Sequence, residues 1–144
     1  MVKAVLDNIA VSGDGHFFLA LLKTEAGDIV PIAIDQSQAQ TISWGQQKEA
    51  FERPLSHDLM LSIIEMLSGT IVRIEVTELR DDIFFAKLVI ENRGIEFEID
   101  ARPSDALALA VRVDVPLYIS EQVIEQSAFT DDIDFEVDGP GAEA

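Results

Sequence analysis

The stretch DARPSDALALAVR, residues 100–112, decides how the second half of this chain folds. Its first six residues hold two carboxylates, a guanidinium and a hydroxyl, and the residues that follow are almost all apolar. Proline is favoured in the first turn of a helix, serine is a good N-terminal cap, and an early aspartate interacts favourably with the helix dipole. The stretch therefore predicts a helix that begins near Pro103, ends near Val113 and buries an alanine and leucine face.

A shorter version of the same pattern, RPLSHD, occupies residues 53–58 and again precedes an apolar run. Large apolar side chains recur in this run at the three- and four-residue spacing of one helix face. They are Leu59, Met60, Ile63, Ile64 and Leu67. Because Gly69 supplies a C-terminal stop, the spacing predicts a helix from Ser56 to about Leu67 that faces a core.

Three strands are predicted between these two helices, over residues 70–79, 83–91 and 95–100. Their side chains alternate between apolar and polar, which is typical of strands with one face on a core. The third strand is expected to turn three apolar side chains toward the core, namely Ile95, Phe97 and Ile99. Its opposite face then carries a row of carboxylates, from Glu96, Glu98 and Asp100.

The N-terminal third of the chain has the pattern of a β-meander, with strands expected over residues 2–11, 16–24 and 29–34. Short segments with glycine and aspartate separate them, and such residues are favoured in tight turns. Asp35 is then expected to cap a helix over roughly residues 36–50. The chain therefore opens with grouped strands and lacks the strand and helix alternation of a parallel sheet.

The C-terminal part predicts a brief strand over residues 116–119, a last helix that Ser120 caps, and an acidic tail over residues 130–144. The tail contains no basic residue, and this composition indicates a disordered segment. The order of the elements predicts an α+β fold. We expect one compact domain over residues 1–129, in which three to four helices pack against a largely antiparallel or mixed sheet.

The composition limits the classes of function. With 27 acidic and 10 basic residues the net charge is −17, which repels a phosphate polymer unless cations or a local basic patch intervene. The sequence has no cysteine, so a metal ion would need oxygen ligands or His16 and His57. No apolar run approaches the ~20 residues that span a bilayer, and the N-terminus lacks the apolar core of a signal peptide. We therefore expect a cytoplasmic protein without a membrane segment.

The two arginine-proline segments allow two interpretations. In the first, Pro54, Ser56, Pro103 and Ser104 only start helices, because proline and serine are favoured at those positions. This interpretation leaves the arginines unexplained, since a cation just before a helix N-terminus is unfavourable unless acids pair with it.

In the second interpretation the charged residues of both segments converge. They are Arg53, His57, Asp58, Asp100, Arg102 and Asp105. Such a cluster is either a lattice of ion pairs that joins two helix starts to a strand end, or an active site. As an active site it would offer arginines and helix N-termini to a phosphate, and a histidine for proton transfer.

Three segments together resemble the bifunctional nuclease family, whose domain is called the BFN domain. They are VPIAI at residues 30–34, RPLSHDL at residues 53–59, and DARPSDALALA followed by Arg112. The resemblance extends over about residues 1–128. One family motif differs: the pattern Ile-Gly-x-x-Glu-Ala is replaced by IDQSQA, so that Asp35 stands for the glycine and Gln38 for the glutamate.

The resemblance implies a compact α+β domain that self-associates, so we expect a homo-oligomer, with a dimer favoured. It also implies a nuclease that acts on the phosphodiester bonds of DNA or RNA. Our hypothesis for this activity uses the charged cluster, with His57, Asp58, Asp100 and Asp105 as catalytic residues. Arg53 and Arg102 would hold the substrate phosphate, Asp100 and Asp105 would ligate a divalent metal ion such as Mg²⁺ or Mn²⁺, and His57 would move a proton.

A non-enzymatic function remains the alternative hypothesis. The chain would then be a self-associating scaffold or a small-anion-binding module, and the arginine, aspartate and histidine cluster would be a structural ion-pair lattice. The strong negative charge and the glutamine at position 38 favour this hypothesis.

Overall fold

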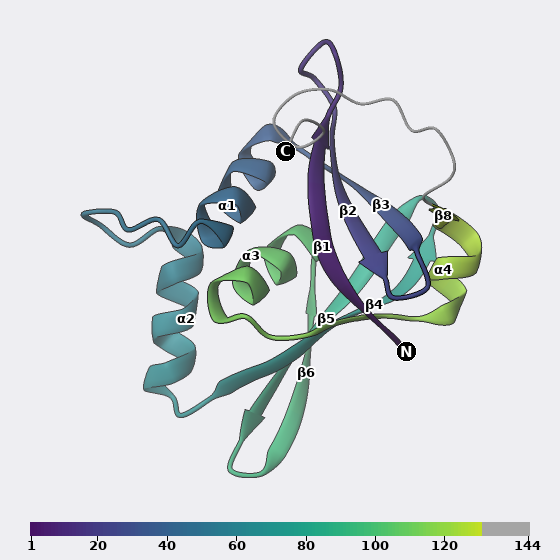
Figure 1. Cartoon of the computed structure of the whole chain (residues 1–144). Helices are drawn as coiled ribbons and strands as arrows, with labels where there is room; N and C mark the ends of the chain where they lie inside the picture. Colours follow the sequence, from purple (N-terminus) through teal and green to yellow (C-terminus); the bar gives the residue numbers. More distant parts are fainter. Residues whose placement is uncertain (131–144) are drawn as a thin grey trace.

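The computed structural model describes residues 1–130, and within them the chain forms eight strands and four helices (Figure 1). The strands are β1 (Val2–Val11), β2 (Phe18–Thr24), β3 (Asp28–Ile34), β4 (Thr70–Arg80), β5 (Ile83–Asn92), β6 (Ile95–Ala101), β7 (Leu117–Ile119) and β8 (Phe129–Thr130). The helices are α1 (Gln36–Gln46), α2 (Ser56–Met66), α3 (Pro103–Val113) and α4 (Glu121–Ser127). No helix in the described residues is long and apolar enough to cross a membrane.

These strands join one mixed sheet in the order β6-β5-β4-β7-β1-β2-β3-β8. β1, β2 and β3 form one antiparallel meander, and β4, β5 and β6 form a second. β7 connects the two halves, because it pairs antiparallel with β1 and parallel with β4. The predicted α+β fold, with three to four helices on a largely antiparallel or mixed sheet, is confirmed.

The helix predicted from DARPSDALALAVR is α3, and it lies at the centre of the core. Ala106, Leu107, Ala108 and Leu109 are each at most 3% exposed. Consecutive residues of a helix point in different directions, so α3 must be covered on several sides. It contacts α1, α2, β4 and β5, and Figure 1 shows it between the sheet and the two preceding helices. The start of α3 is thereby fixed relative to α2.

The helix predicted over residues 36–50 is shorter than expected and ends at Gln46. Lys48 has the left-handed conformation, with φ 55°, and therefore cannot continue the helix. Its ammonium group donates hydrogen bonds to the last carbonyls of α3, Val111 O at 2.8 Å and Arg112 O at 3.1 Å. These hydrogen bonds hold the residues that follow α1 against the C-terminus of α3.

The two-residue strand β8 was not predicted. It extends the sheet beyond β3, with Phe129 opposite Ile29 and Thr130 opposite Asp28. The expected boundary between a domain over residues 1–129 and an acidic tail falls inside this strand. Residues 131–144, which contain the rest of the predicted tail, lie outside the described residues, so this division stays a prediction.

The three apolar side chains of β6 that were expected to face the core point to the core side of the sheet, but they are not buried. Ile95, Phe97 and Ile99 are 59, 52 and 46% exposed. Phe97 pairs with Ile90 and Ile99 with Leu88, and both partners are core residues, so the side chains do point to the core side of the sheet. β6 is the terminal strand, however, and the helices that cover β4 and β5 do not extend over it.

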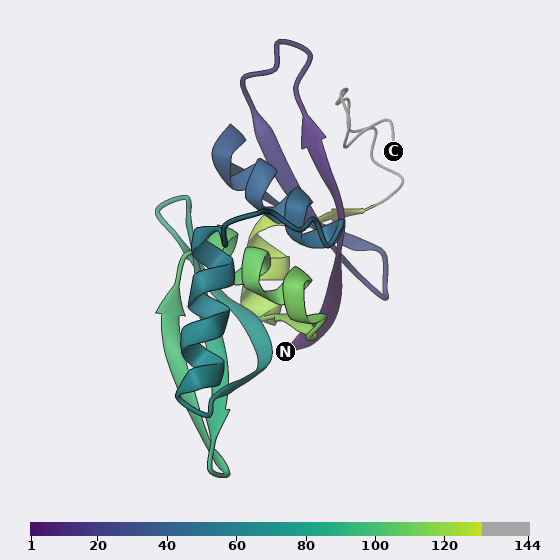
Figure 2. The same ribbon diagram turned by 90° about the vertical axis from the view of Figure 1, so that its left-hand side faces the viewer.

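α2 was expected to face a core, but only one edge of the helix packs against it. The helix has no fully buried residue, and only Leu61 and Ile64 pack partly against the core. The Leu67 carbonyl, directly after α2, accepts a hydrogen bond from Asn92 at the end of β5, so α2 ends beside the β5–β6 hairpin. Figure 2 shows the β5–β6 hairpin extending past the end of α2. We name the exposed apolar residues of both elements the α2–β6 face: Leu59, Met60, Ile63, Met66, Leu67, Ile95, Phe97 and Ile99.

Candidate active site

His57 and Asp105 are 48 residues apart in the sequence and meet where α2 and α3 begin. His57 Nε2 lies 2.9 Å from Asp105 Oδ1. Asp105 Oδ2 accepts a hydrogen bond from Arg102 Nε at 2.8 Å. The His57 side chain is only 13% exposed, whereas Arg102 is open to solvent. The structure thus brings together three of the six predicted site residues, and we name them the His57–Asp105–Arg102 cluster.

The surroundings of Asp105 keep its carboxylate ionised. Burial raises the pKa of Asp105, but hydrogen bonds from Arg102 and His57 outweigh this effect and hold the pKa below its usual range. The hydrogen bond from Arg102 to Asp105 also raises the pKa of Arg102. An ionised carboxylate only accepts hydrogen bonds, so His57 must carry a proton on Nε2. In the neutral ring Nδ1 then holds the free lone pair, as a general base requires.

The lowered pKa of Asp105 predicts a contribution to stability that depends on pH. Its carboxyl binds a proton more tightly in the unfolded chain, so the stabilisation is present above the unfolded pKa of about 3.9 and is lost as the pH falls through the folded pKa. We expect the difference in urea midpoint between the wild type and Asp105→Asn to be large at pH 6 and to shrink below about pH 4. An equal difference at pH 6 and pH 3 would contradict this assignment.

Asp58 belongs to a separate set of contacts. Its Oδ1 accepts a hydrogen bond from Arg112 Nε at 3.0 Å, and its Oδ2 accepts one from the N–H of Leu55 at 3.0 Å. Arg112 also donates to the carbonyls of Thr41 and Ala108, at 3.2 and 2.7 Å, and its side chain is only 7% exposed. Both oxygens of Asp58 are therefore engaged: Oδ2 caps the start of α2, and Oδ1 binds Arg112, which joins α2 and α3 to α1.

The other two predicted site residues join neither group. Arg53 is exposed in the loop before α2. Asp100 is exposed in β6, opposite Lys87 in β5. Within residues 1–130 no hydrogen bond or ion pair of either side chain is found, so their roles stay predictions.

Within residues 1–130 the side chains as they lie do not form a metal site. The described part of the chain has no group of three or more histidines, aspartates or glutamates that could hold a metal ion. Both oxygens of Asp105 interact with His57 and Arg102, and Asp100 is not part of that cluster. The observed donor set therefore does not fit a directly bound metal ion, and ligation by Asp100 and Asp105 stays a prediction.

A pocket of about 260 Å³ opens beside Arg102 at the N-terminus of α3. Its walls come from β3, the start of α1, the turn between β4 and β5, and the first residues of α3. The polar residues that line it are Gln38, Asp82, Arg102 and Ser104. We name this cavity the α3 pocket.

Sequence reasoning missed three of these four polar residues as site residues. Ser104 and Ser56 were expected to cap helices, yet the N-caps are Arg102 and Leu55, and both serines lie inside the first turn. Gln38 takes part in the capping box of α1, where its side-chain oxygen accepts a hydrogen bond from the N–H of Asp35 at 2.8 Å. A signal was present, because the segments VPIAI and DARPSD both supply residues to this pocket.

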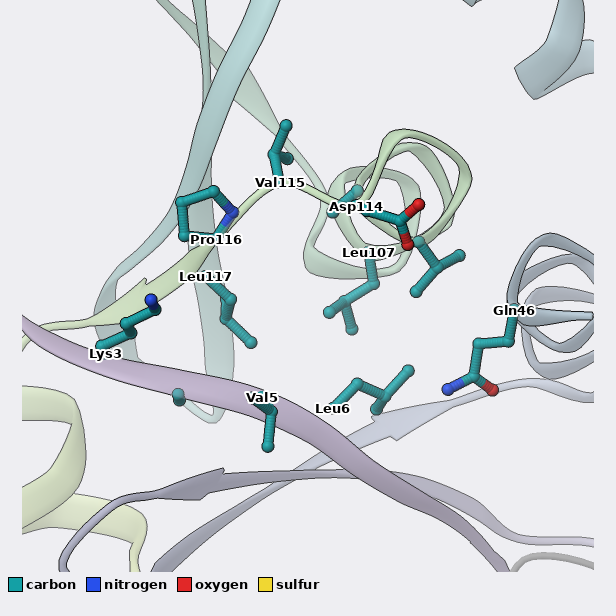
Figure 3. A pocket seen from close by; sticks show the side chains of 12 residues that line it. Lys3, Val5, Leu6, Gln46, Leu107, Asp114, Val115, Pro116 and Leu117 are labelled. Carbon is teal, nitrogen blue, oxygen red and sulfur yellow. The ribbon is translucent and has the colours of Figure 1, made fainter. Parts of the chain in front are cut away.

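A larger groove of about 540 Å³ lies between β1 and α3 (Figure 3). Leu6 of β1 and Leu107 of α3 are among its apolar side chains, and Figure 3 shows these two facing one another, whereas Val5 points away from α3. The polar side chains that line it are Lys3, Gln46 and Asp114. No member of the His57–Asp105–Arg102 cluster lines the groove, so the reactive groups lie at the opposite end of α3.

Residues 20–132 match the family model described as the bifunctional nuclease domain. An uncharacterized protein of Mycobacterium tuberculosis is 37% identical over 108 residues, which cover 74% of this chain and 64% of that protein. Bifunctional nuclease 1 of Oryza sativa subsp. japonica is 23% identical over 108 residues, which cover 72% of this chain and 33% of the rice protein. The chain thus spans less than two thirds of the length of these curated relatives.

Proposed function

Because this chain belongs to the bifunctional nuclease domain family, we propose that it hydrolyses phosphodiester bonds of DNA or RNA at the His57–Asp105–Arg102 cluster. The position of Asp105 carries this proposal. One of its oxygens orients an imidazole and the other holds a guanidinium beside a pocket. A group that transfers protons and a group that binds phosphate therefore share one carboxylate.

The proposed reaction forms a bond from a water oxygen to phosphorus and breaks the bond to the leaving oxygen. His57 accepts the proton of the attacking water or supplies one to the leaving oxygen, while Asp105 holds the ring in one tautomer. Arg102 stabilises the charge that develops on the phosphoryl oxygens. Arg53, in the exposed loop before α2, is proposed as a second phosphate contact.

Cleavage assays with purified protein test this function. Single-stranded DNA and RNA are incubated with the protein, with EDTA, and with EDTA followed by excess Mg²⁺ or Mn²⁺. Loss of cleavage in EDTA and its recovery with metal would support metal assistance, and cleavage that persists in EDTA would support proton transfer without metal. A folded protein that cleaves neither substrate under any of these conditions contradicts the proposed nuclease.

The alternative is a non-enzymatic module in which the charged residues only join helices. The bonds of Arg112 to Asp58 and to two carbonyls favour it, because they form a lattice of this kind. Arg102, in contrast, is exposed and binds a single partner, which suits a ligand contact better than a structural joint. Either function is proposed to operate in the cytoplasm.

We also propose that the α2–β6 face is where two copies of this chain associate. The face has eight large apolar side chains that are 38 to 86% exposed. Large exposed apolar patches often mark sites of protein–protein association. Asp58, the acid in the first turn of α2, pairs with Arg112, and Glu65 is an exposed acid in the last turn. A second copy is the proposed partner, because in a symmetric dimer the same apolar face of each copy can cover that of the other.

Charged substitutions on the α2–β6 face are expected to separate the two copies. Met66→Glu and Phe97→Glu each place a carboxylate where apolar surface would be buried, so both variants should elute as monomers. The measurement is size-exclusion chromatography with light scattering on wild type and variants. Phe17→Glu is the matched control, because Phe17 is 69% exposed outside this face and its replacement should leave the mass unchanged. A wild type that is monomeric at all concentrations would contradict the proposed dimer.

A further inference from the structure

Ser104 is a largely buried residue whose hydroxyl group has no hydrogen-bond partner within the described residues. The residue is 6% exposed and lines the α3 pocket, and no hydrogen bond of its hydroxyl is found within residues 1–130. The hydroxyl does not close the helix start, because the N-cap of α3 is Arg102. An unpaired hydroxyl of a residue that lines a pocket can donate a hydrogen bond to an acceptor that enters the pocket.

The first turn of α3 offers two further donors. Pro103 has no N–H, and the first hydrogen bond of the helix runs from the N–H of Ala106 to the carbonyl of Arg102 at 3.0 Å. The N–H groups of Ser104 and Asp105 precede this bond, and neither has a partner in the part of the chain that the structure describes. No side chain caps the helix there. Free N–H groups at the positive end of a helix dipole attract an anion.

Arg102 supplies a positive charge at the same place. It lines the pocket and uses Nε to donate to Asp105. Neither Nη atom makes a hydrogen bond within the described residues. A guanidinium anchored through one nitrogen can present the other two to the oxygens of a phosphate group.

Nearby carboxylates limit the charge that a ligand can carry. Asp82 lines the pocket, Asp105 binds Arg102, and Asp35 lies close enough to Arg102 to strengthen its charged form. With one cation among three acids, an anion with two negative charges is disfavoured. The single charge of a phosphodiester group suits this balance better than the charge of inorganic phosphate.

The remaining walls indicate what is attached to the phosphate. Ile83, Phe84 and Pro103 give the pocket an apolar side, on which a sugar or a base can lie. A volume of about 260 Å³ has no room for a stacked base pair. A base that enters such a pocket must be unpaired.

We propose that the α3 pocket binds one phosphodiester group of a single-stranded polynucleotide through Ser104 Oγ, the N–H groups of Ser104 and Asp105, and the guanidinium of Arg102. This inference rests on the proposed function and deepens it, because it names unpaired strands as the substrate class. It places the substrate phosphate next to the carboxylate that orients His57.

Thymidylyl-thymidine, a dinucleotide with one phosphodiester group and no partner strand, is the probe that tests this proposal. In a ¹H–¹⁵N NMR titration of the full chain, the amide signals of Ser104 and Asp105 are expected to shift. Ser104→Ala should weaken binding about tenfold, since it removes a hydrogen bond to a charged group. Ser56→Ala is the matched control, because Ser56 occupies the first turn of α2, is exposed and lines neither the α3 pocket nor the groove.

Arg102→Gln provides a second variant whose folding is not at risk, because Arg102 is exposed, and it too should weaken binding. Amide shifts that occur only elsewhere, the lack of any shift, or unchanged affinity in Ser104→Ala would each overturn the proposal. Equal affinity for a duplex would overturn its single-strand part. Binding of the dinucleotide without cleavage of any substrate would contradict the nuclease and leave the pocket assignment standing. Cleavage without amide shifts at Ser104 and Asp105 would support the nuclease and overturn the pocket assignment.

Discussion

Replacing Arg112 with methionine is expected to lower the free energy of unfolding by about 3 kcal/mol. The Arg112 side chain is 7% exposed and donates hydrogen bonds to Asp58, Thr41 O and Ala108 O. Methionine keeps much of the apolar stem but leaves one carboxylate oxygen and the Thr41 carbonyl without this donor. Because these contacts join three helices, the substitution should loosen the contacts of α1 and α2 with α3 as well as lower the stability.

Urea denaturation of wild type and variant measures this effect, and Arg53→Met is the control. Arg53 is exposed and has no ion pair within the described residues, so its replacement should change the free energy of unfolding by less than about 0.5 kcal/mol. A double mutant with Asp58→Ala should lose less stability than the sum of the two single mutants, because both of them remove the same ion pair. Equal midpoints for Arg112→Met and wild type would show that this lattice does not stabilise the fold.

Asp105→Asn is expected to reduce phosphodiester cleavage about a hundredfold or more. The carboxylate holds His57 through one oxygen and Arg102 through the other, and an amide can accept from only one of them. The amide nitrogen would face one of two donors, so either the ring or the guanidinium would lose its position. His57→Ala should cause a loss of similar size, because it removes the proton-transfer group itself.

Controls separate catalysis from folding in this experiment. Glu25→Gln removes an exposed carboxylate far from the cluster in sequence, and this variant should cleave like the wild type. Melting temperatures of all variants show which of them remain folded. If Asp105→Asn is folded and cleaves at the wild-type rate, the cluster is not the active site. Asp100→Asn tests the metal hypothesis. A loss of activity would support a metal ion held by Asp100, whereas unchanged activity would support proton transfer by His57 without that ligand.

Local patterns predicted most of the secondary structure. The alternation over residues 70–79 and 83–91 became β4 and β5, which differ from the predicted strands by one residue at most. The Arg-Pro segments did start α2 and α3, although the serines were not the caps. Such signals are local, because they depend on hydrogen bonds and side-chain spacing within one or two turns of the chain.

The exposed side chains of β6 and α2 show where local patterns stop being informative. The alternation in β6 correctly placed Phe97 on the core side of the sheet. Whether that side is covered depends on how far the helices reach across the sheet, and the core ends at β5. Periodicity therefore predicts the direction of a side chain, and it does not predict whether another element packs against it.

The sequence by itself determined the α+β class, the order of the elements and the two helix starts that carry the charged residues, because each depends on neighbours along the chain. Only the tertiary structure decided the pairing of these charges. It joined His57 to Asp105 and Asp58 to Arg112, left Arg53 and Asp100 without ion pairs within the described residues, and placed the Ser104 hydroxyl in a pocket. The physical reason is that an ion pair forms between groups within about 4 Å in space, and the packing of α2 against α3 sets those distances.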